Sequence, residues 1–441
     1  MPQASFKNLA KTMVALIENG SLPPGTRLPT HRKLAENQGI APATATRVYK
    51  DLIERGLVVG EQGRGMFVRD RGIPITLGVE QRSNNGMLDL VFNMPGETSD
   101  EDFLRAGLRK LANSGDLEAM LRYQPHGGRP HERKIIASSL KPQVGSIHSD
   151  QLLIVSGAQH GLSTVIMGLL NRNDTVATDA LTYTGFKAAA LMHQLQLRSA
   201  SGSETLVDPD RLERLCRDCS IKAVYLIPTV HNPLGLVMSE SHRNKIVEVA
   251  RKYDILIIED GAYAFLEENP PPSFVQLAPE RTVYVGGFSK NLGTGLRVGY
   301  IVAPEICVPK LTMAIRATTW NAPGIVTALV TGWIGEGVLA KSEENRRASG
   351  KRRQEMCRKM LPGTEIISHP NASFAWLPLR NGRRADPIIS RLMSKGVVVS
   401  GGDAFAVLDA VPQGLRIAFG GTNETELESA LMKINEHLKQ Q

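Results

Sequence analysis

The sequence predicts an α/β protein that carries a separate helical unit at its N-terminus. Two observations lead to this prediction. Helical periodicity and a short hairpin pattern occupy residues 1–70, whereas short apolar runs alternate with amphipathic stretches through residues 89–441. Because buried strands that alternate with helices usually form a parallel sheet covered on both faces, we expect a largely parallel sheet in the second region.

Composition is consistent with this division and limits the function classes. Hydrophobic content of 42% and charged content of 22% are ordinary for a globular protein. Residues 1–70 contain ten Lys and Arg against six Asp and Glu, which favours a polyanionic partner for that region. No signal-peptide core or membrane-length apolar run is present, so we expect a cytoplasmic protein without a membrane partner.

Cysteine usage points to a reducing compartment. Four cysteines in 441 residues are too few for a disulfide scaffold. Cys216 and Cys219 form a CxxC, but no second pair and no nearby histidine accompany it. We interpret them as two thiols near a helix end and predict no metal site. His126, His160 and His231 are interpreted as loop or core histidines, because their spacing suggests no metal.

The N-terminal unit begins with two predicted helices. The stretch "SFKNLAKTMVALIENG" places five apolar residues on one helical face, and "LPPGTRLP" ends that helix with proline and glycine. Thr30 is the expected N-cap of a short helix, "HRKLAENQ", which Gly39 closes. The apolar face of the first helix comprises Phe6, Leu9, Met13, Leu16 and Ile17.

A third helix and a hairpin complete this unit. The stretch "PATATRVYKDLIERG" begins with Pro42 in the first turn and ends at Gly56. Its inward residues are expected to be Val48, Leu52 and Ile53. Thr44 and Arg47, three residues apart, share the opposite face. In "LVVGEQGRGMFVRD", two short strands flank a glycine-rich tip that carries Arg64.

A helix, a helix–turn–helix and a β-wing form the layout of a winged DNA-binding module, since a helix fits the major groove and a basic hairpin reaches phosphates. The stretch from "LPPGTRLP" to "GRGMFV" resembles the GntR-type winged helix along nearly its whole length. The resemblance implies double-stranded operator DNA as a partner. The DNA-binding candidates are Arg32, Thr44, Arg47 and Arg64. The alternative is a unit used only for dimerisation or packing.

Residues 71–88 lack periodicity and are predicted to be a linker. Beyond them, apolar runs end in polar loops in "QLLIVSGAQHGL", "AVYLIPTVHN", "DILIIEDGAY" and "TVYVGGFSK". Ligands of open α/β sheets bind beyond the carboxyl ends of the strands, so these loops should form one pocket. The predicted pocket residues are Ala158, Gln159, Asn232, Asp260, Tyr263, Lys290 and Arg297.

This residue set suits pyridoxal 5'-phosphate (PLP). Lys290, directly after a buried strand, would form a Schiff base with the aldehyde once its amine is neutral. Asp260 as a carboxylate would keep the pyridine nitrogen protonated. Asn232 and Tyr263 can reach the ring oxygen. The phosphate would take backbone N–H groups of a helix start at "SGAQHGL", together with Arg297.

Residues 90–441 resemble the fold type I aminotransferases, through "TVHNPLG", "IIEDGAY" and "FSKNLGTGLRVGY". The resemblance implies a large domain and a small C-terminal α/β domain. "LTYTGF" implies that Tyr183 lies against the cofactor, and "LRYQPHGGRPHERK" implies that Tyr123 reaches the phosphate of the partner subunit. "GLRIAFG" implies that Arg416 binds a substrate carboxylate.

Three positions depart from the aminotransferase pattern. Gly287 stands three residues before the lysine, where Ser or Thr usually binds the phosphate, and Ser289 is the adjacent hydroxyl. Leu234 replaces the threonine of "NPTG", and Thr184 replaces the proline of "YPG". One phosphate contact is therefore in question.

The order of the two regions resembles the MocR family of bacterial transcription regulators. This resemblance implies a head-to-tail homodimer in which an amine, an amino acid or a B6 vitamer changes the aldimine at Lys290 and thereby DNA binding. Two alternatives remain: an active aminotransferase that carries a DNA-binding unit, and a dimerisation scaffold that has lost PLP.

Overall fold

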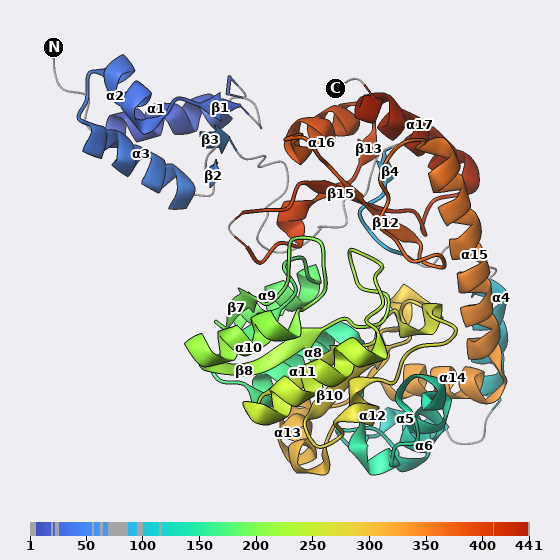
Figure 1. Cartoon of the computed structure of the whole chain (residues 1–441). Coiled ribbons are helices and arrows are strands. Elements are labelled where there is room, and N and C mark those ends of the chain that lie inside the picture. The colour runs from blue at the N-terminus through green and yellow to red at the C-terminus, as the bar shows by residue number, and fades with distance from the viewer. Residues whose placement is uncertain are drawn as a thin grey trace.

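The computed structural model describes residues 6–18, 21–22, 26–54, 57–61, 65–68, 87–94, 100–113, 117–408 and 410–439. It contains an N-terminal unit, a large lobe around a seven-stranded sheet, and a small lobe near the C-terminus (Figure 1). No helix in these ranges is both long and apolar enough to span a bilayer. The sequence-based fold class is confirmed.

The N-terminal unit consists of three helices and a three-stranded antiparallel sheet of order β1-β3-β2. Thr30 caps the second helix, since its hydroxyl accepts the N–H of Lys33 at 3.2 Å, and Gly39 ends that helix with a φ of 59°. Both caps are as predicted. The elements are α1 (Phe6–Glu18), β1 (Arg27–Leu28), α2 (His31–Gln38), α3 (Pro42–Glu54), β2 (Val58–Glu61) and β3 (Gly65–Val68).

Most of the residues predicted to point into the core of this unit are buried, but two are exposed. Val48 and Leu52 of α3 are fully buried, but Ile53 is 45% exposed and Leu16 of α1 is 37% exposed. Both misplaced residues lie at the edge of an apolar face, where periodicity alone does not show which neighbours cover them. Tyr49 fills the core beside Val48 instead, and its hydroxyl donates to the carbonyl of Pro29 at 2.5 Å.

The large lobe is built on a sheet of order β5-β11-β10-β9-β8-β6-β7. The four pairs from β10 to β7 are parallel, whereas β11 is antiparallel to both of its neighbours, so the sheet is mainly parallel. The strands are β5 (Leu152–Val155), β6 (Thr175–Thr178), β7 (Gln196–Ser199), β8 (Ile221–Leu226), β9 (Leu256–Asp260), β10 (Thr282–Gly287) and β11 (Gly299–Val302). The four apolar runs predicted as strands correspond to β5, β8, β9 and β10.

Helices cover both faces of this sheet because successive strand residues point to opposite sides. In β8, Ala223 and Tyr225 belong to one core cluster, and Val224 and Leu226 belong to another. The first face is covered by α8 (Ala158–Leu169), α9 (Thr184–Met192) and α13 (Val308–Thr318). The second is covered by α6 (Pro130–Ser139), α7 (Lys141–Val144), α10 (Pro209–Asp218), α11 (Glu240–Lys252), α12 (Phe274–Leu277) and α14 (Gly324–Gly335).

The small lobe has a three-stranded sheet of order β12-β15-β14 and a separate parallel pair, β13 with β4. Its strands are β4 (Leu88–Asp89), β12 (Phe374–Pro378), β13 (Val397–Val398), β14 (Ser400–Gly401) and β15 (Gly414–Ala418). Its helices are α15 (Val338–Met360), α16 (Ala385–Ser394) and α17 (Glu424–Lys439). Helix α15 runs from the large lobe to the small lobe along one side (Figure 1).

The remaining described elements are two helices and five 3-10 turns. They are α4 (Asp100–Ala112), α5 (Leu117–Leu121) and the 3-10 turns η1 (Ser149–Gln151), η2 (Ala264–Leu266), η3 (Thr294–Leu296), η4 (Glu305–Cys307) and η5 (Gly402–Ala404).

Candidate functional site

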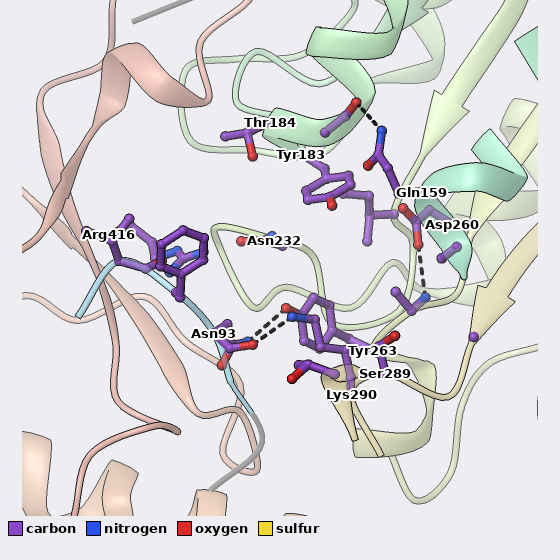
Figure 2. A pocket seen from close by; sticks show the side chains of 18 of the residues that line it. Asn93, Gln159, Tyr183, Thr184, Asn232, Asp260, Tyr263, Ser289, Lys290 and Arg416 are labelled. Atoms are coloured by element: carbon purple, nitrogen blue, oxygen red, sulfur yellow. Dashed lines mark hydrogen bonds between the residues drawn. The ribbon is translucent and has the colours of Figure 1, made fainter. Parts of the chain in front are cut away.

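The carboxyl ends of four strands open onto one cavity of about 310 Å³, which lies between the two lobes (Figure 2). Strands β8, β9 and β10 are parallel to one another, and β5 shares their direction because β11 is antiparallel to both β10 and β5. Their loops therefore meet at one edge. The lining includes Val91, Asn93, Ala158, Gln159, Tyr183, Asn232, Asp260, Tyr263, Gly287, Ser289, Lys290, Arg297 and Arg416.

One corner of the cavity is suited to an anion. Helix α8 starts there, and its N-cap residue Gly157 offers no side-chain cap to the first N–H groups. Gly157 has a φ of 89°, and a Cβ atom at this position would lie 2.7 Å from Nη2 of Arg297. The glycine thus allows the guanidinium to approach the helix start. Arg297 also donates to the Ser289 hydroxyl at 3.3 Å, so cation, hydroxyl and helix start share this corner.

Asp260 ends β9 at the floor of the cavity and is 3% exposed. The Tyr225 hydroxyl donates to its Oδ2 at 2.7 Å, and the N–H of Ala262 donates to its Oδ1 at 3.0 Å. Burial raises the pKa of this carboxyl above its ordinary value, while the hydrogen bond from Tyr225 opposes the rise. A cation placed against Asp260 would offset the cost of burying the carboxylate.

Tyr225 was missed by the sequence interpretation, although it belongs to the run "AVYLIPTV". It lies mid-strand in β8, stacked on Phe186 with ring centroids 3.7 Å apart. Burial raises the pKa of its hydroxyl, which therefore remains a hydrogen-bond donor. The sequence around a tyrosine in an apolar strand does not indicate that its hydroxyl will bond to a carboxylate on the neighbouring strand.

Asn232 and two tyrosines approach the middle of the cavity. Asn232 is 4% exposed, and its Oδ1 has no hydrogen-bond partner among the described residues, so this oxygen can accept a hydrogen bond from a ligand donor. The Tyr263 hydroxyl accepts a hydrogen bond from Nδ2 of Asn93 at 2.8 Å. Tyr183 is the N-cap residue of α9, and burial raises the pKa of its hydroxyl.

Lys290 follows β10 and is half-buried. Its Nζ donates to the backbone carbonyl of Asn93 at 2.6 Å and lies 5.8 Å from the centroid of the Tyr263 ring. Figure 2 shows Asn93 joined to Lys290 and Tyr263 by these hydrogen bonds. Asn93 is the second residue that sequence reasoning missed, since it belongs to the short segment after the predicted linker.

Arg416 comes from the small lobe, in the middle of β15, and is 6% exposed. Its Nη1 donates to the carbonyl of Val91 at 2.6 Å, and its buried Nε has no partner among the described residues. Burial lowers the pKa of the guanidinium below its ordinary value. A buried cation that lacks a carboxylate partner is costly, so an anionic ligand group would be favoured here.

The N-terminal unit presents three of the four predicted DNA-contacting residues. Arg32 on α2 and Arg47 on α3 are exposed, and Thr44 is half-buried on the same helix as Arg47. Val48 and Leu52 attach the opposite side of α3 to the core, which leaves the face with Arg47 open. Arg64 lies outside the described residues.

Comparison with known proteins gives matches for both regions. Residues 7–68 match the family model of bacterial regulatory proteins of the gntR family, and residues 90–434 match aminotransferase class I and II. The uncharacterized HTH-type transcriptional regulator YdeF of Bacillus subtilis is 25% identical over 97% of this chain and 93% of its own length. Its counterpart YjiR of Escherichia coli is 24% identical, with 98% of each chain covered.

The chain belongs to the aminotransferase class I and II family, and its domain order is the MocR-type architecture. It fuses a GntR-family helix–turn–helix domain to an aminotransferase class I and II domain.

Solved structures show the same fold for the larger domain. An α-aminoadipate aminotransferase, LysN of Thermus thermophilus, was solved with N-(5'-phosphopyridoxyl)-L-leucine. It is 22% identical, with a TM-score of 0.74, over 84% of this chain and 97% of its own. A kynurenine aminotransferase of Pyrococcus horikoshii has a TM-score of 0.75 and 24% identity, over 81% and 91% of the two chains.

The pocket of this MocR-type chain fits PLP on its own geometry. Three cations, Lys290, Arg297 and Arg416, line it against one carboxylate, Asp260, so the pocket has an excess of positive charge for a phosphate to balance. The buried carboxyl of Asp260 is an acceptor of the kind that a protonated ring nitrogen needs, and the side-chain amide of Asn232 carries N–H donors of the kind that a ring oxygen needs.

At Gly287, where the aminotransferase pattern has Ser or Thr, the structure leaves little space for a side chain. A Cβ atom there would lie 3.2 Å from the N atom of Ala158 and 3.1 Å from the carbonyl oxygen of Val298. The glycine therefore sits directly against the start of α8, and the Ser289 hydroxyl lines the pocket and accepts from Arg297.

Ala158, Gln159 and Tyr123 were also predicted to bind the cofactor, and the structure gives each of them a different position. Ala158 provides the first N–H of α8. Gln159 donates from Nε2 to the carbonyl of Gly185 at 2.8 Å, which ties α8 to the loop of Tyr183. Tyr123 lies outside the lining and is 87% exposed, tilted against Trp320 with ring centroids 5.5 Å apart. It does not join this pocket within one chain.

The histidines and cysteines have other surroundings. Within the described ranges, no group of three or more His, Cys, Asp or Glu side chains is arranged to hold a metal ion. His231 is buried 3.3 Å from Asp179, while His160 and His126 contact Thr318 and the carbonyl of Trp320. Cys216 and Cys219 are free thiols at the end of α10.

Proposed function

We propose that this transcription regulator binds PLP at Lys290 and binds operator DNA through α2, α3 and the wing. Its effector would be an amino acid, an amine or a B6 vitamer that enters the same pocket. The observation that carries the proposal is the convergence of Lys290, Asp260 and the anion corner of α8 on one cavity. Action on chromosomal DNA places the protein in the cytoplasm.

Each part of the cofactor has a partner among these residues. The start of α8, Arg297 and Ser289 would hold the phosphate, and Asp260, itself oriented by Tyr225, would hold the ring nitrogen. Asn232 and Tyr263 would bind the ring oxygen, and Tyr183 would lie against the ring. In a head-to-tail homodimer, the exposed Tyr123 of one subunit would reach the phosphate held by the other.

When bound, PLP supplies an aldehyde that condenses with primary amines with loss of water, and a protonated ring that withdraws electrons. The chain's own residues set the conditions for this chemistry. Asp260 retains the proton on the ring nitrogen, Lys290 provides the amine, and Arg416 orients a carboxylate toward it. A change at Lys290 or Arg416 would shift the lobes and reorient the DNA-binding units.

A working aminotransferase is the second candidate, because Lys290, Asp260 and Arg416 together also suffice to bind an amino acid for transamination. Turnover with an amino donor and a keto acid distinguishes this candidate from a regulator. A scaffold without cofactor is the third alternative, and a visible absorption band of bound PLP would exclude it.

The decisive experiment uses Lys290→Ala. We expect the purified parent protein to be yellow and to form a borohydride-stable adduct that peptide mapping places on Lys290. The variant should lose this adduct and keep its far-UV circular dichroism. Lys187→Ala is the matched control, since Lys187 is also half-buried and also donates to backbone carbonyls, those of Asp403 and Ala404, outside the cavity lining. An adduct on another lysine would contradict the assignment.

A further inference from the structure

Residues 87–94, here called the strap, are the first described part of the chain after the DNA-binding unit. The strap is fixed to the small lobe by backbone hydrogen bonds. The N–H groups of Leu88 and Leu90 donate to Gly396 and Val398 at 2.7 and 2.9 Å, and the N–H of Ala418 donates to Leu90 at 2.7 Å. Leu90 is fully buried in the core of that lobe. The strap therefore moves with the small lobe.

The same segment continues into the ligand pocket, where Val91 and Asn93 line the cavity. The carbonyl of Val91 accepts from Nη1 of Arg416, and the carbonyl of Asn93 accepts from Nζ of Lys290, each at 2.6 Å. The side-chain amide of Asn93 donates to the Tyr263 hydroxyl at 2.8 Å. Asn93 is only 8% exposed. Three groups that a ligand would use thus have strap atoms as partners (Figure 2).

Two of these contacts compete with a ligand. A carboxylate forms charge-assisted, bidentate hydrogen bonds with a guanidinium, which are roughly twice as strong as bonds to a neutral carbonyl. A carboxylate that takes Nη1 of Arg416 as one of its two donors would therefore displace the Val91 carbonyl. At Lys290, covalent attachment of an aldehyde carbon leaves Nζ with fewer N–H groups than the ammonium has, which weakens its bond to the Asn93 carbonyl. The Tyr263 hydroxyl, in contrast, can donate to a ring oxygen while it accepts from the Asn93 amide, so this bond persists and keeps the strap in contact with the ring site.

We propose that the strap is the element through which pocket occupancy reaches the DNA-binding unit, by exchange of its bonds to Lys290 and Arg416 for ligand bonds while Asn93 stays bonded to Tyr263. This proposal rests on the proposed function, because it needs a ligand at Lys290. In the sequence, residues 69–86 join the strap to the end of β3. Asn93 is then a positioning residue that acts through Lys290 and Tyr263.

The test compares the full-length parent with Asn93→Ala, which removes the bond to Tyr263 and loosens the strap. Operator affinity is measured on a DNA fragment from the gene's own upstream region, with and without PLP. If PLP changes the parent's operator affinity by a typical allosteric factor of about 5–150, we expect that factor to fall to about one in the variant. The PLP-free variant should bind the operator like PLP-loaded parent, and it should bind PLP more tightly.

Asn371→Ala is the matched control, because Asn371 also donates from its side-chain amide, to the carbonyl of Leu266, but does not line the ligand cavity. It should respond to PLP like the parent. An Asn93→Ala protein that responds to PLP like the parent would overturn the strap proposal and leave the proposed function intact. A parent protein that neither binds PLP nor responds to it would overturn both.

A second measurement needs no variant. Amide hydrogen exchange of the parent is followed by mass spectrometry with and without PLP. The strap proposal requires that exchange within residues 87–94 changes on PLP binding, because the strap's contacts are rearranged. Unchanged exchange in this segment, together with a PLP-dependent operator affinity, would overturn it.

Discussion

At the scale of single residues, Arg416 is the group whose surroundings say most about the ligand. It is buried between the rings of Phe374 and Phe405, with its Cζ atom 6.0 and 5.4 Å from their centroids. The aromatic rings and the Val91 carbonyl only partly replace water around the charge. A guanidinium held in this way is prepared for a carboxylate, which favours an amino acid over a bare amine as effector.

This interpretation predicts the behaviour of Arg416→Ala. The variant should bind PLP like the parent, because the phosphate and ring contacts come from other strands. Its response to amino acids should weaken by about 1.5–3 kcal/mol, roughly ten- to a hundredfold, as expected for hydrogen bonds to a charged group. Its response to the corresponding decarboxylated amines should not change. Spectral titration with each amino acid and with its decarboxylated amine measures the two responses.

Arg380→Ala serves as the control, since Arg380 is also an arginine of the small lobe but binds Glu204 and Glu365 near the surface. A full response of Arg416→Ala to amino acids would rule out the carboxylate role. Loss of PLP from that variant would instead show that Arg416 supports the cofactor itself.

At the scale of elements, the sequence predicted those features that depend on residues close together in the chain. The strands that carry Asn232, Asp260 and Lys290 were recognised from apolar runs, and the caps of α2 from Thr30 and Gly39. The exposure of Ile53 was predicted wrongly, and the contacts of Tyr225 and Asn93 were not predicted. All three are determined by residues distant in the sequence. Tyr225 meets Asp260 one strand away, and Asn93 meets Lys290 across 197 positions of the chain. Such contacts leave no periodic signal.

Helix α3 supports a prediction about DNA binding. Buried Val48 and Leu52, and the bond from Tyr49 to Pro29, fix the helix so that Arg47 faces outward. Arg47→Ala should therefore weaken operator binding by about 1–3 kcal/mol while PLP absorbance stays unchanged. Thr44→Ala should act in the same direction. Fluorescence anisotropy with operator and unrelated DNA measures the loss and its sequence dependence.

Arg172→Ala is a suitable control, because Arg172 is an exposed arginine of the large lobe, outside the DNA-binding unit. Parent-like operator binding by both α3 variants would show that another face of the unit meets the DNA.

At the scale of the whole molecule, the pocket lies where the two lobes are tied together. The loop of Tyr183 pairs with the small lobe, since the N–H of Thr182 donates to Phe405 and the N–H of Val407 donates to Ala180, both at 2.9 Å. Beside it, Glu204 accepts from Nε1 of Trp376 at 2.8 Å. The strap also joins the small lobe to Lys290, and residues next to two of the other connections line the cavity, since Tyr183 follows Thr182 and Arg416 pairs with Trp376.

Coupling between the pocket and the DNA-binding unit would have to be reciprocal. If PLP changes operator affinity by some factor through a shift between two states, the operator must change PLP affinity by the same factor. We therefore expect spectral titrations of PLP-free protein, with and without saturating operator, to give two dissociation constants. Their ratio should match the ratio of operator dissociation constants measured with and without PLP. Unrelated DNA should leave PLP affinity unchanged, and Asn93→Ala should reduce both ratios equally. A change in operator affinity without the matching change in PLP affinity would mean that the pocket and the DNA-binding unit do not share one conformational equilibrium.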